Sequence, residues 1–225
     1  MSVKPWLILV FLGYLVLSPS VWALEDDQQS STNTTENRWF LKLDLTGIIF
    51  NVSGTVKVRG TSVSGASVSL TNSASISGDL GYFVTSNVAL DIGFGYPPQT
   101  TVDGKGTLSF IGAGARSRYA PVAILVQYHL NDLAPIRPFI GVGPAYSMFF
   151  DKEPKTIRSP RVENAWGAAL QGGLDYDLSA DWGANFELIK IFSSTTASGV
   201  VAGTPATADV RVNTLIIRSG LTLRF

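Results

Sequence analysis

Few residues in this chain could carry acid–base chemistry. His129 is its only histidine, and Asp132 follows three positions later. A histidine and a carboxylate at this spacing could act as a base and its orienting partner, provided that a nucleophile lies beside them. With one histidine, no cysteine and no calcium-type run of oxygen ligands, the sequence predicts no metal site. It also predicts no cofactor, because its glycine pairs lie inside predicted strands rather than before helices.

Composition excludes several other classes of protein. The full chain has 17 basic and 17 acidic residues, so its bulk charge does not favour nucleic-acid binding. Lys4 precedes an apolar run over residues 6–17, and Val21 and Ala23 stand at the −3 and −1 positions of a predicted cleavage site. Residues 1–23 are therefore predicted to be a cleaved signal peptide. Residues 24–37 are polar and acidic, and we expect a flexible lead-in.

The rest of the chain, residues 38–225, shows a two-residue period typical of β-strands. In the first segment Leu41, Leu43 and Leu45 alternate with Lys42, Asp44 and Thr46. The pattern predicts eight strands, over residues 38–52, 73–84, 88–96, 119–130, 137–150, 164–178, 182–192 and 210–225. Pro144 would be unusual in a central strand unless it sits at a bulge, so the facing of the fifth strand is left open.

The connections between these strands alternate in length. Residues 97–118, 151–163 and 193–209 are predicted to be long loops, and residues 53–72 either a loop or a strand extension beyond the membrane. The other connections are short, so all long segments would lie on one side of a membrane. Aromatic residues also mark the strand ends, as interfacial girdles require: Trp39, Tyr82, Phe83, Tyr96, Tyr119, Tyr128, Phe149, Phe150, Tyr176, Trp182, Phe192 and Phe225.

These patterns predict an all-β protein, an eight-stranded antiparallel up-and-down transmembrane β-barrel. A single edge between first and last strands would remain, and pairing residues 210–225 with residues 38–52 would close it. The expected location is the outer membrane of a Gram-negative bacterium, with outer-membrane lipid and lipopolysaccharide as surroundings. A soluble lipid-carrying barrel would have the same period with its faces exchanged, and the aromatic strand ends count against it.

Several stretches resemble the OmpW family of outer-membrane barrels, including its alkane-uptake members. They cover most of residues 38–225 and lie at 81–91, 120–128, 137–151, 165–176 and 181–182. The end of the chain also resembles the signal read by the barrel-assembly machinery, with Arg218, Gly220, Leu223 and Phe225 at the matching positions. The resemblance implies a narrow apolar lumen that passes small hydrophobic molecules, with sideways release into the bilayer as one route.

The alternation assigns residues to the interior of such a barrel. Eight strands leave room only for side chains or one slim ligand. The apolar lumen is predicted to be lined by Gly93, Gly95, Ala123, Leu125, Gly167, Ala169 and Ile216, and the resemblance adds a constriction near Gly93 and Ile189. Nearer the periplasm an ion-pair network is predicted, because buried charges must be paired, from Lys42, Asp44, Asp175, Glu187, Arg218 and Arg224.

The predicted function is passive uptake of small hydrophobic, alkane-like molecules through this lumen. One alternative is a structural or adhesive barrel that acts through its extracellular loops, or one whose charged core leaves no passage. Another is an enzyme in the barrel wall. His129 would lie beside the periplasmic turn, whereas a base acting on outer-leaflet lipid belongs near the long loops. The sequence therefore favours a protein that is not an enzyme.

Overall fold

The computed structural model describes residues 38–225, with Asp151 and Lys152 described by their backbone alone. The predicted signal peptide (1–23) and lead-in (24–37) lie outside the described residues. Within the described part, no helix has the length and apolar character needed to cross a membrane. Two short 3-10 helices are present, η1 (Ser109–Ile111) and η2 (Asn131–Leu133). The strands are β1 (Trp39–Val58), β2 (Thr61–Ser62), β3 (Ala66–Leu70), β4 (Ser73–Phe83), β5 (Val88–Gly95), β6 (Gln99–Gly106), β7 (Ala113–His129), β8 (Ile136–Pro154), β9 (Arg158–Val162), β10 (Ala165–Asp177), β11 (Trp182–Val201) and β12 (Thr204–Arg224).

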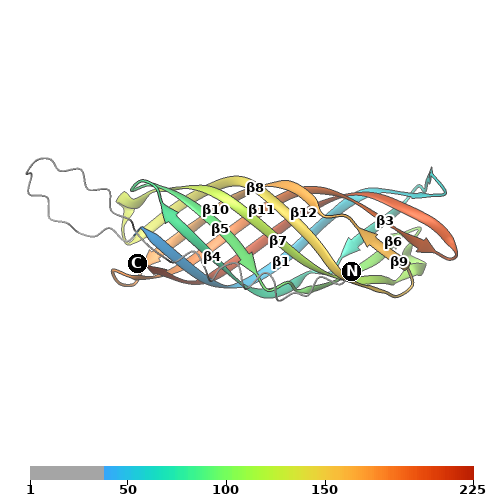
Figure 1. The fold of residues 1–225 in the computed structure, drawn as a ribbon, viewed down its shortest axis with the longest axis horizontal. Coiled ribbons are helices and arrows are strands. Elements are labelled where there is room, and N and C mark those ends of the chain that lie inside the picture. The colour runs from blue at the N-terminus through green and yellow to red at the C-terminus, as the bar shows by residue number, and fades with distance from the viewer. Residues whose placement is uncertain (1–37) are drawn as a thin grey trace, which may run out of the picture. The chain divides into compact units, whose positions relative to one another are not determined.

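Eight of these strands form a closed ring. The order is β1, β4, β5, β7, β8, β10, β11 and β12, and every neighbouring pair is antiparallel. The ring closes where β12 pairs with β1, from Phe40 opposite Arg224 to Val58 opposite Ala206. Figure 1 shows the strands winding obliquely around the barrel. The predicted eight-stranded antiparallel barrel, closed by its first and last strands, is confirmed.

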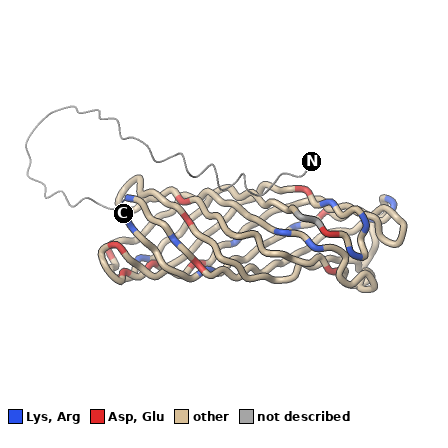
Figure 2. The backbone as a smooth tube through the Cα atoms, turned by 60° about the horizontal axis from the view of Figure 1, so that its bottom comes forward, with Lys and Arg blue, Asp and Glu red and all other residues tan. Residues whose placement is uncertain are grey.

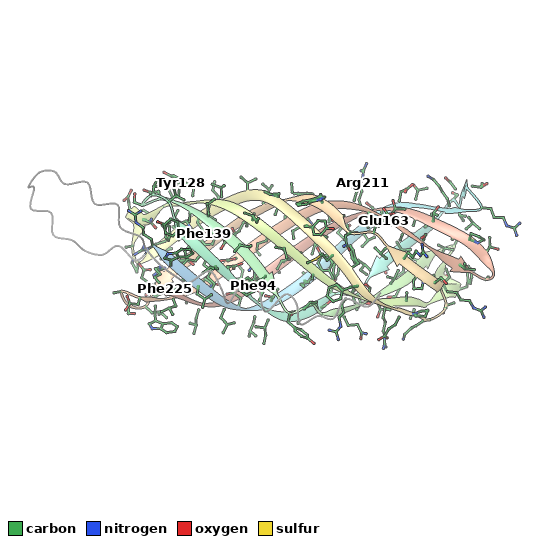
Figure 3. All side chains as sticks on the ribbon, in the orientation of Figure 1. Phe94, Tyr128, Phe139, Glu163, Arg211 and Phe225 are labelled. Carbon is green, nitrogen blue, oxygen red and sulfur yellow. The ribbon has the colours of Figure 1, made fainter. Side chains whose placement is uncertain are left out.

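The two faces of the wall carry the predicted alternation. On β1, Leu43 and Leu45 are exposed on the outer face, whereas Lys42 and Asp44 are buried inside. β12 ends the same way, with Leu221 exposed beside buried Thr222. Apolar side chains therefore surround the barrel, and Figure 3 shows them projecting from the wall. A barrel with an apolar outside and charges inside is built for a bilayer rather than for water.

The predicted long loops at residues 97–118, 151–163 and 193–209 are wrong, because strands continue through most of them. β11 and β12 stay paired up to Val201 opposite Thr204. Their turn is Ala202–Gly203, and both residues have positive φ, 47° and 80°, as a tight hairpin turn requires. Residues 97–118 and 193–209 are rich in Ser, Thr, Gly and Ala, and residues 151–163 are rich in charged residues, so none of the three shows alternating large apolar residues. Backbone pairing with the neighbouring strand, which leaves no trace in composition, keeps them extended.

Other extensions enlarge the same end of the barrel. β1 runs on to Val58 and turns back through β2, so residues 53–72 are a strand extension rather than a plain loop. β3 pairs with β6, β6 with β7, and β9 with β11. In Figure 1, β3, β6 and β9 lie at the end opposite the C-terminus and the short turns. Among the exposed large hydrophobic residues of the described chain, Phe110 alone lies in these extensions, so the wall is longer than the apolar band around it.

Pro144 lies within a central strand without a bulge, the arrangement that the sequence made unusual. On β10 it faces Ala168 in unbroken register. On β7 the register is the same on both sides of it, with Ala123 opposite Ala145 and Val126 opposite Val142. The side chain of Pro144 is exposed on the lipid face. The structure also settles the facing of β8, because Phe139, Ala145, Ser147 and Phe149 are buried inside.

Candidate lumen and lateral gap

The inward residues of β12 mark the successive levels of the interior. Going outward from the periplasmic end they are Arg224, Thr222, Arg218, Ile216, Thr214, Val212, Val210 and Ala208, all of them buried. Charged, apolar, hydroxyl-bearing and again apolar levels therefore follow one another along a single strand. Side chains from the other strands complete each level.

The charged level is a network of buried ion pairs. Lys42 Nζ lies 2.6 Å from Glu187 Oε1 and 3.1 Å from Asp175 Oδ1. Arg218 Nη1 donates to both carboxylate oxygens of Asp79 at 2.6 and 2.7 Å. Arg218 Nε lies 3.7 Å from Glu187 Oε2, which links the two pairs. We call Lys42, Asp44, Asp79, Asp175, Glu187 and Arg218 the charge network.

The remaining predicted network residues lie at its edges. Asp44 Oδ2 is 4.0 Å from Arg218 Nη1, a longer contact than the others. Arg224 lies nearer the periplasmic rim, with Nη1 2.8 Å from Asp177 Oδ1. Asp79 was missing from the predicted network, although the alternation of β4 already turned it inward. What the sequence could not reveal is that Asp79 reaches Arg218, 139 positions away.

Polar and aromatic side chains pack beneath the network. Gln171 Nε2 donates to Glu187 Oε2 at 3.0 Å, and Gln127 Nε2 donates to Gln171 Oε1 at 2.8 Å. His129 is buried, stacks on Phe139 at 4.8 Å between centroids, and its Nε2 lies 2.9 Å from Gln127 Oε1. The neighbours of His129 are thus other inward-facing side chains of the barrel.

His129 does not pair with Asp132, the arrangement that the disfavoured enzyme alternative would need. Asp132 is exposed in η2, whereas the carboxylate nearest to the ring is Asp175, at 4.0 Å from Nδ1. No nucleophile appears among these contacts. Within residues 38–225, no group of three or more His, Cys, Asp or Glu residues could hold a metal ion.

An apolar level lies directly outward of the network. We call it the apolar chamber, and its residues are Ala123, Leu125, Ala145, Ala169, Ile189, Ile191 and Ile216. Five of the predicted lumen residues belong to it, namely Ala123, Leu125, Ala169, Ile189 and Ile216. Gly93 instead faces the charge network: a Cβ added there would lie 2.7 Å from Asp79 Oδ1. Gly167 lies against the backbone of Phe192, and Gly95 is exposed at the edge of β5.

An aromatic level closes the apolar chamber on its outer side. Tyr119 is 0% exposed, and its hydroxyl lies 3.2 Å from Thr214 Oγ1 and 3.3 Å from Ser147 Oγ. Its ring packs on Phe50 and Phe149 at 5.1 and 5.3 Å between centroids. Tyr119 and Phe149 were predicted as girdle residues, which is wrong: both point inward. The sequence could have shown this for Tyr119, because it lies an even number of positions from Ala123 and Leu125 on β7 and therefore shares their inward face.

A second apolar level fills the extended end, and we call it the outer apolar core. Its buried residues are Val56, Ala66, Leu108, Ile111, Ala208, Val210 and Val212. A cavity of about 100 Å³ adjoins it, lined by Val56, Leu108 and Ala208 together with Ile157 and Val201. Apolar surface therefore exists on both sides of Tyr119: the apolar chamber lies on its periplasmic side and the outer apolar core on its outer side.

The wall is interrupted between β5 and β7. Their pairing ends at Gly93 opposite Ala123, and the pairing of β7 with β6 begins only at Gln99 opposite Arg118. We call this interval the lateral gap. Proline has no N–H to donate to a ladder, and three prolines stand here: Pro97, Pro98 and Pro121. The outer edge of the gap is held by Tyr119 N donating to Pro98 O at 3.2 Å.

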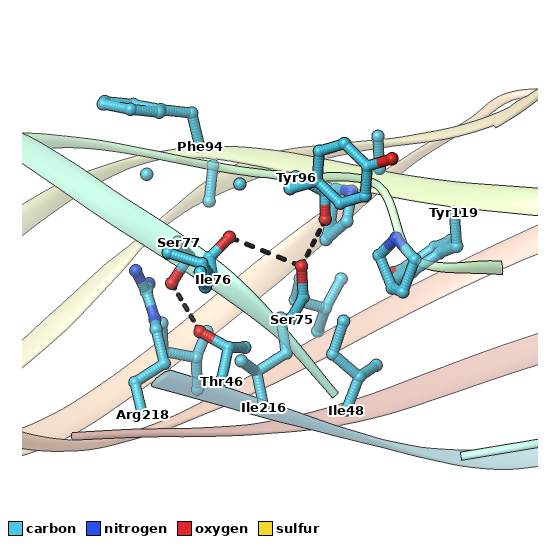
Figure 4. A pocket seen from close by; sticks show the side chains of 18 residues that line it. Thr46, Ile48, Ser75, Ile76, Ser77, Phe94, Tyr96, Tyr119, Ile216 and Arg218 are labelled. Atoms are coloured by element: carbon cyan, nitrogen blue, oxygen red, sulfur yellow. Dashed lines mark hydrogen bonds between the residues drawn. The ribbon is translucent and has the colours of Figure 1, made fainter. Parts of the chain in front are cut away.

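A pocket of about 50 Å³ lies at the lateral gap. Its lining includes Ile189 and Ile216, which are 2% and 6% exposed in the interior, and Phe94 and Tyr96, which are 40% and 66% exposed on the lipid face. Figure 4 shows Ile216 and Ile48 on one side of this pocket and Phe94 and Tyr96 on the other. The same hollow thus borders both the apolar chamber and the outside of the barrel.

The four residues of the predicted assembly signal lie at the periplasmic end of β12. Leu223 and Phe225 face outward, whereas Arg218 is buried in the charge network. At Gly220 an added Cβ would clash with the backbone oxygen of Leu43 and with Asp44. Glycine at this position is thus required for close contact between β12 and β1, independently of any role in the assembly signal.

Comparisons with known proteins agree with this architecture. The model of the OmpW family matches residues 36–225. Outer membrane protein AlkL of Ectopseudomonas oleovorans is 27% identical, over 95% of this chain and 93% of its own length. Its structure in lipid bilayers has a TM-score of 0.69, over 90% of this chain and 97% of that one.

Two further relatives widen the comparison. Dibenzothiophene metabolism operon protein PahQ of Pseudomonas aeruginosa is 31% identical, over 83% of this chain and 88% of its own length. The crystal structure of OprG from Pseudomonas aeruginosa is 20% identical with a TM-score of 0.79, over 84% of this chain and 96% of that one, and supports the fold.

A closed antiparallel ring of eight strands with an apolar outer face defines a transmembrane β-barrel of the outer membrane. Among such barrels, this chain belongs to the OmpW family. Its location is the outer membrane of a Gram-negative bacterium. OmpW-family barrels are not enzymes in general, and no catalytic family is indicated.

Proposed function

We propose that this protein is a passive conduit for small apolar molecules, which enter through the outer apolar core and leave sideways into the bilayer through the lateral gap. It is not an enzyme. The observation that carries the proposal is the pocket at the gap, where buried Ile189 and Ile216 and exposed Phe94 and Tyr96 line one hollow.

The charge network argues against an axial exit to the periplasm. An apolar molecule on that route would have to part Lys42 from Glu187 and Arg218 from Asp79, which are in contact at 2.6 Å. Separating buried ion pairs without new partners costs several kcal/mol per ion. The apolar chamber, by contrast, offers an apolar surface, so an apolar solute enters it at little cost in free energy.

The lateral gap offers a route at low cost. The backbone there is not closed by a β5–β7 ladder, so widening it breaks few hydrogen bonds. Outward of the gap stand lipid-facing side chains such as Phe94, so a solute moves from an apolar interior to an apolar exterior. The proposed solutes are slim alkanes or flat aromatic molecules, because eight strands leave no wider passage.

The relatives agree with this class of solute. PahQ is named for a dibenzothiophene metabolism operon, and dibenzothiophene is a flat apolar molecule. Tyr119 is the barrier between the outer apolar core and the apolar chamber, because its ring and its two hydroxyl contacts occupy the level between them. Passage requires this side chain to swing aside.

A disulfide across the lateral gap tests the proposal, and the chain contains no cysteine that would interfere. Phe94→Cys with Val122→Cys joins β5 and β7 one position beyond the last pair of their ladder. Leu90→Cys with Val126→Cys, a pair inside the intact ladder, is the matched control. The measurement is uptake of a labelled long-chain alkane and of dibenzothiophene by cells whose outer membrane contains the folded barrel.

We expect oxidation of the first pair to reduce uptake to the level of cells without the protein, and a reductant to restore it. The control pair should leave uptake unchanged in both states. Undiminished uptake with a formed 94–122 disulfide would rule out the lateral route. Equal uptake with and without the protein would rule out transport altogether.

A further inference from the structure

Lys190 is a charged side chain on the lipid-facing side of the wall. On β11, Glu187, Ile189 and Ile191 are buried inside, whereas Leu188 and Phe192 are 44% exposed outside. Lys190 lies between the latter two and shares their face. Among the side chains that the structure describes, none forms an ion pair with Lys190. A lysine facing hydrocarbon is costly near the bilayer midplane and tolerated only near an interface.

Lys190 lies near the outer border of the apolar band. It pairs with Leu215 on β12, and Leu215 pairs with Ile49 on β1. Leu215 and Ile49 are followed on their strands by polar outward residues, whereas on β11 one more apolar outward residue, Phe192, follows Lys190. The next outward positions are Asn213 and Asn51, which pair with each other. The ammonium group can therefore extend along the wall to the headgroup level of the outer leaflet.

Arg211 supplies a second cation above Lys190. It is exposed on β12, in register with Ser194 on β11 and Ser53 on β1. The nearest carboxylate along its strand, Asp209, is held by Lys57 at 2.9 Å. Arg211 itself has no ion pair in the part of the chain that the structure describes. Lys190 and Ser194 are separated by four residues of β11, or about 13 Å of backbone.

A polar hollow of about 600 Å³ lies beside Arg211. Hydroxyl and amide groups line it, together with two carboxylates; the residues are Ser53, Gly54, Thr55, Glu163, Asn164, Ser194, Thr195, Thr196, Asp209, Val210 and Arg211. Figure 3 shows Arg211 and Glu163 on the extended half of the barrel. Such a lining offers donors and acceptors to sugar hydroxyls, with the cations at its membrane side.

The surrounding charge favours an anionic partner. Figure 2 shows Lys and Arg gathered around the extended end of the barrel. Among the side chains that the structure describes, basic residues outnumber acidic ones there; they are Lys57, Arg59, Lys105, Arg116, Arg118, Lys155, Arg158, Arg161 and Arg211, against Asp103, Glu153, Glu163 and Asp209. Anionic groups at the membrane surface are attracted by such clusters.

We propose that Lys190, Arg211 and the polar hollow form a binding site for a phosphorylated glycolipid of the outer leaflet, the lipid A part of lipopolysaccharide. Its acyl chains would lie on the apolar band at Ile49 and Leu215. Its phosphates would bind Lys190 and Arg211 through charge-assisted hydrogen bonds. Its sugars would enter the hollow. A lipid fits better than free phosphate, because Lys190 is reached only along the apolar surface. This site does not depend on the proposed transport.

The test uses the full barrel in phosphatidylcholine nanodiscs, with bound lipid measured by native mass spectrometry. The added lipids are lipid A with two phosphates, lipid A without phosphate, and phosphatidylglycerol; inorganic phosphate is added as a competitor. The variants are Lys190→Gln, Arg211→Gln and both together. Lys105→Gln is the matched control, because Lys105 lies on β6, away from β11 and β12. Lys190→Arg keeps the charge.

We expect two-phosphate lipid A to bind more tightly than phosphatidylglycerol. Each Gln substitution should weaken it about tenfold, the usual effect of losing one charge-assisted hydrogen bond, whereas Lys105→Gln and Lys190→Arg should bind as the unchanged protein does. Equal binding by the double variant overturns the proposal. So does equal binding of phosphatidylglycerol, or displacement by inorganic phosphate, because the site would then not select lipid A.

Discussion

Arg218 on β12 forms an ion pair with Asp79 on β4 inside the barrel, and its Nη1 donates to both carboxylate oxygens at 2.6 and 2.7 Å. β1 stands between these two strands in the ring, so the contact spans the seam where the barrel closes. The same Arg218 adjoins the apolar chamber, because Ile216 of the chamber precedes it by two residues on β12. The closing strand therefore carries both the base of the apolar chamber and the ion pair beneath it.

Removing one partner of this pair should destabilise the barrel. Arg218→Met leaves Asp79 and Glu187 buried with one cation fewer, and breaking a buried pair in this way costs about 3–5 kcal/mol. Urea unfolding of the refolded barrel in lipid vesicles measures the change. Arg218→Met combined with Asp79→Leu should recover a large part of the loss. If the single variant unfolds like the unchanged protein, the pair contributes nothing to stability.

Gly93 should be needed for the position of the same ion pair. In Gly93→Ala, the new Cβ would lie 2.7 Å from Asp79 Oδ1 and 3.4 Å from Arg218 Nη2, so the pair must shift. We expect a loss of about 1–3 kcal/mol in the free energy of unfolding, as for other overpacked sites. Gly172→Ala is the control, since nothing lies within 4 Å of its added Cβ. A similar effect of both substitutions would assign the loss to strand propensity instead.

Tyr119 should set the rate of entry into the apolar chamber. Tyr119→Ala removes the ring that separates the two apolar levels, so uptake of a labelled alkane should rise, at a stability cost of about 3–5 kcal/mol. Tyr119→Phe keeps the ring and loses the contacts to Thr214 and Ser147. Its uptake should therefore lie between that of the unchanged protein and that of Tyr119→Ala. Tyr128→Ala, which changes an exposed residue of the same strand, is the control. Unchanged uptake in Tyr119→Ala, with the protein shown to be folded, would mean that the barrier lies elsewhere.

Local patterns in the sequence were sufficient to determine the eight strands, the facing of all of them except β8, and the closure of the ring. A two-residue period places Leu43 outside and Lys42 inside by itself, because alternation along a strand needs no knowledge of the partner strand. The same rule placed Ile216, Arg218 and Glu187 in the interior. It was not applied to Tyr119, which was assigned to the aromatic girdle because it lies near a strand end, although the alternation along β7 turns it inward.

Only the tertiary structure decided which inward residues meet. The contact between Arg218 and Asp79, the lateral gap and the extension of β11 and β12 all depend on the register between strands distant in sequence. Register follows from backbone pairing and barrel closure, which residue types describe weakly. The sequence thus determined a barrel with charged and apolar interior residues. The pairing of strands decided that these residues form separate levels and that the lateral gap lies beside the apolar chamber.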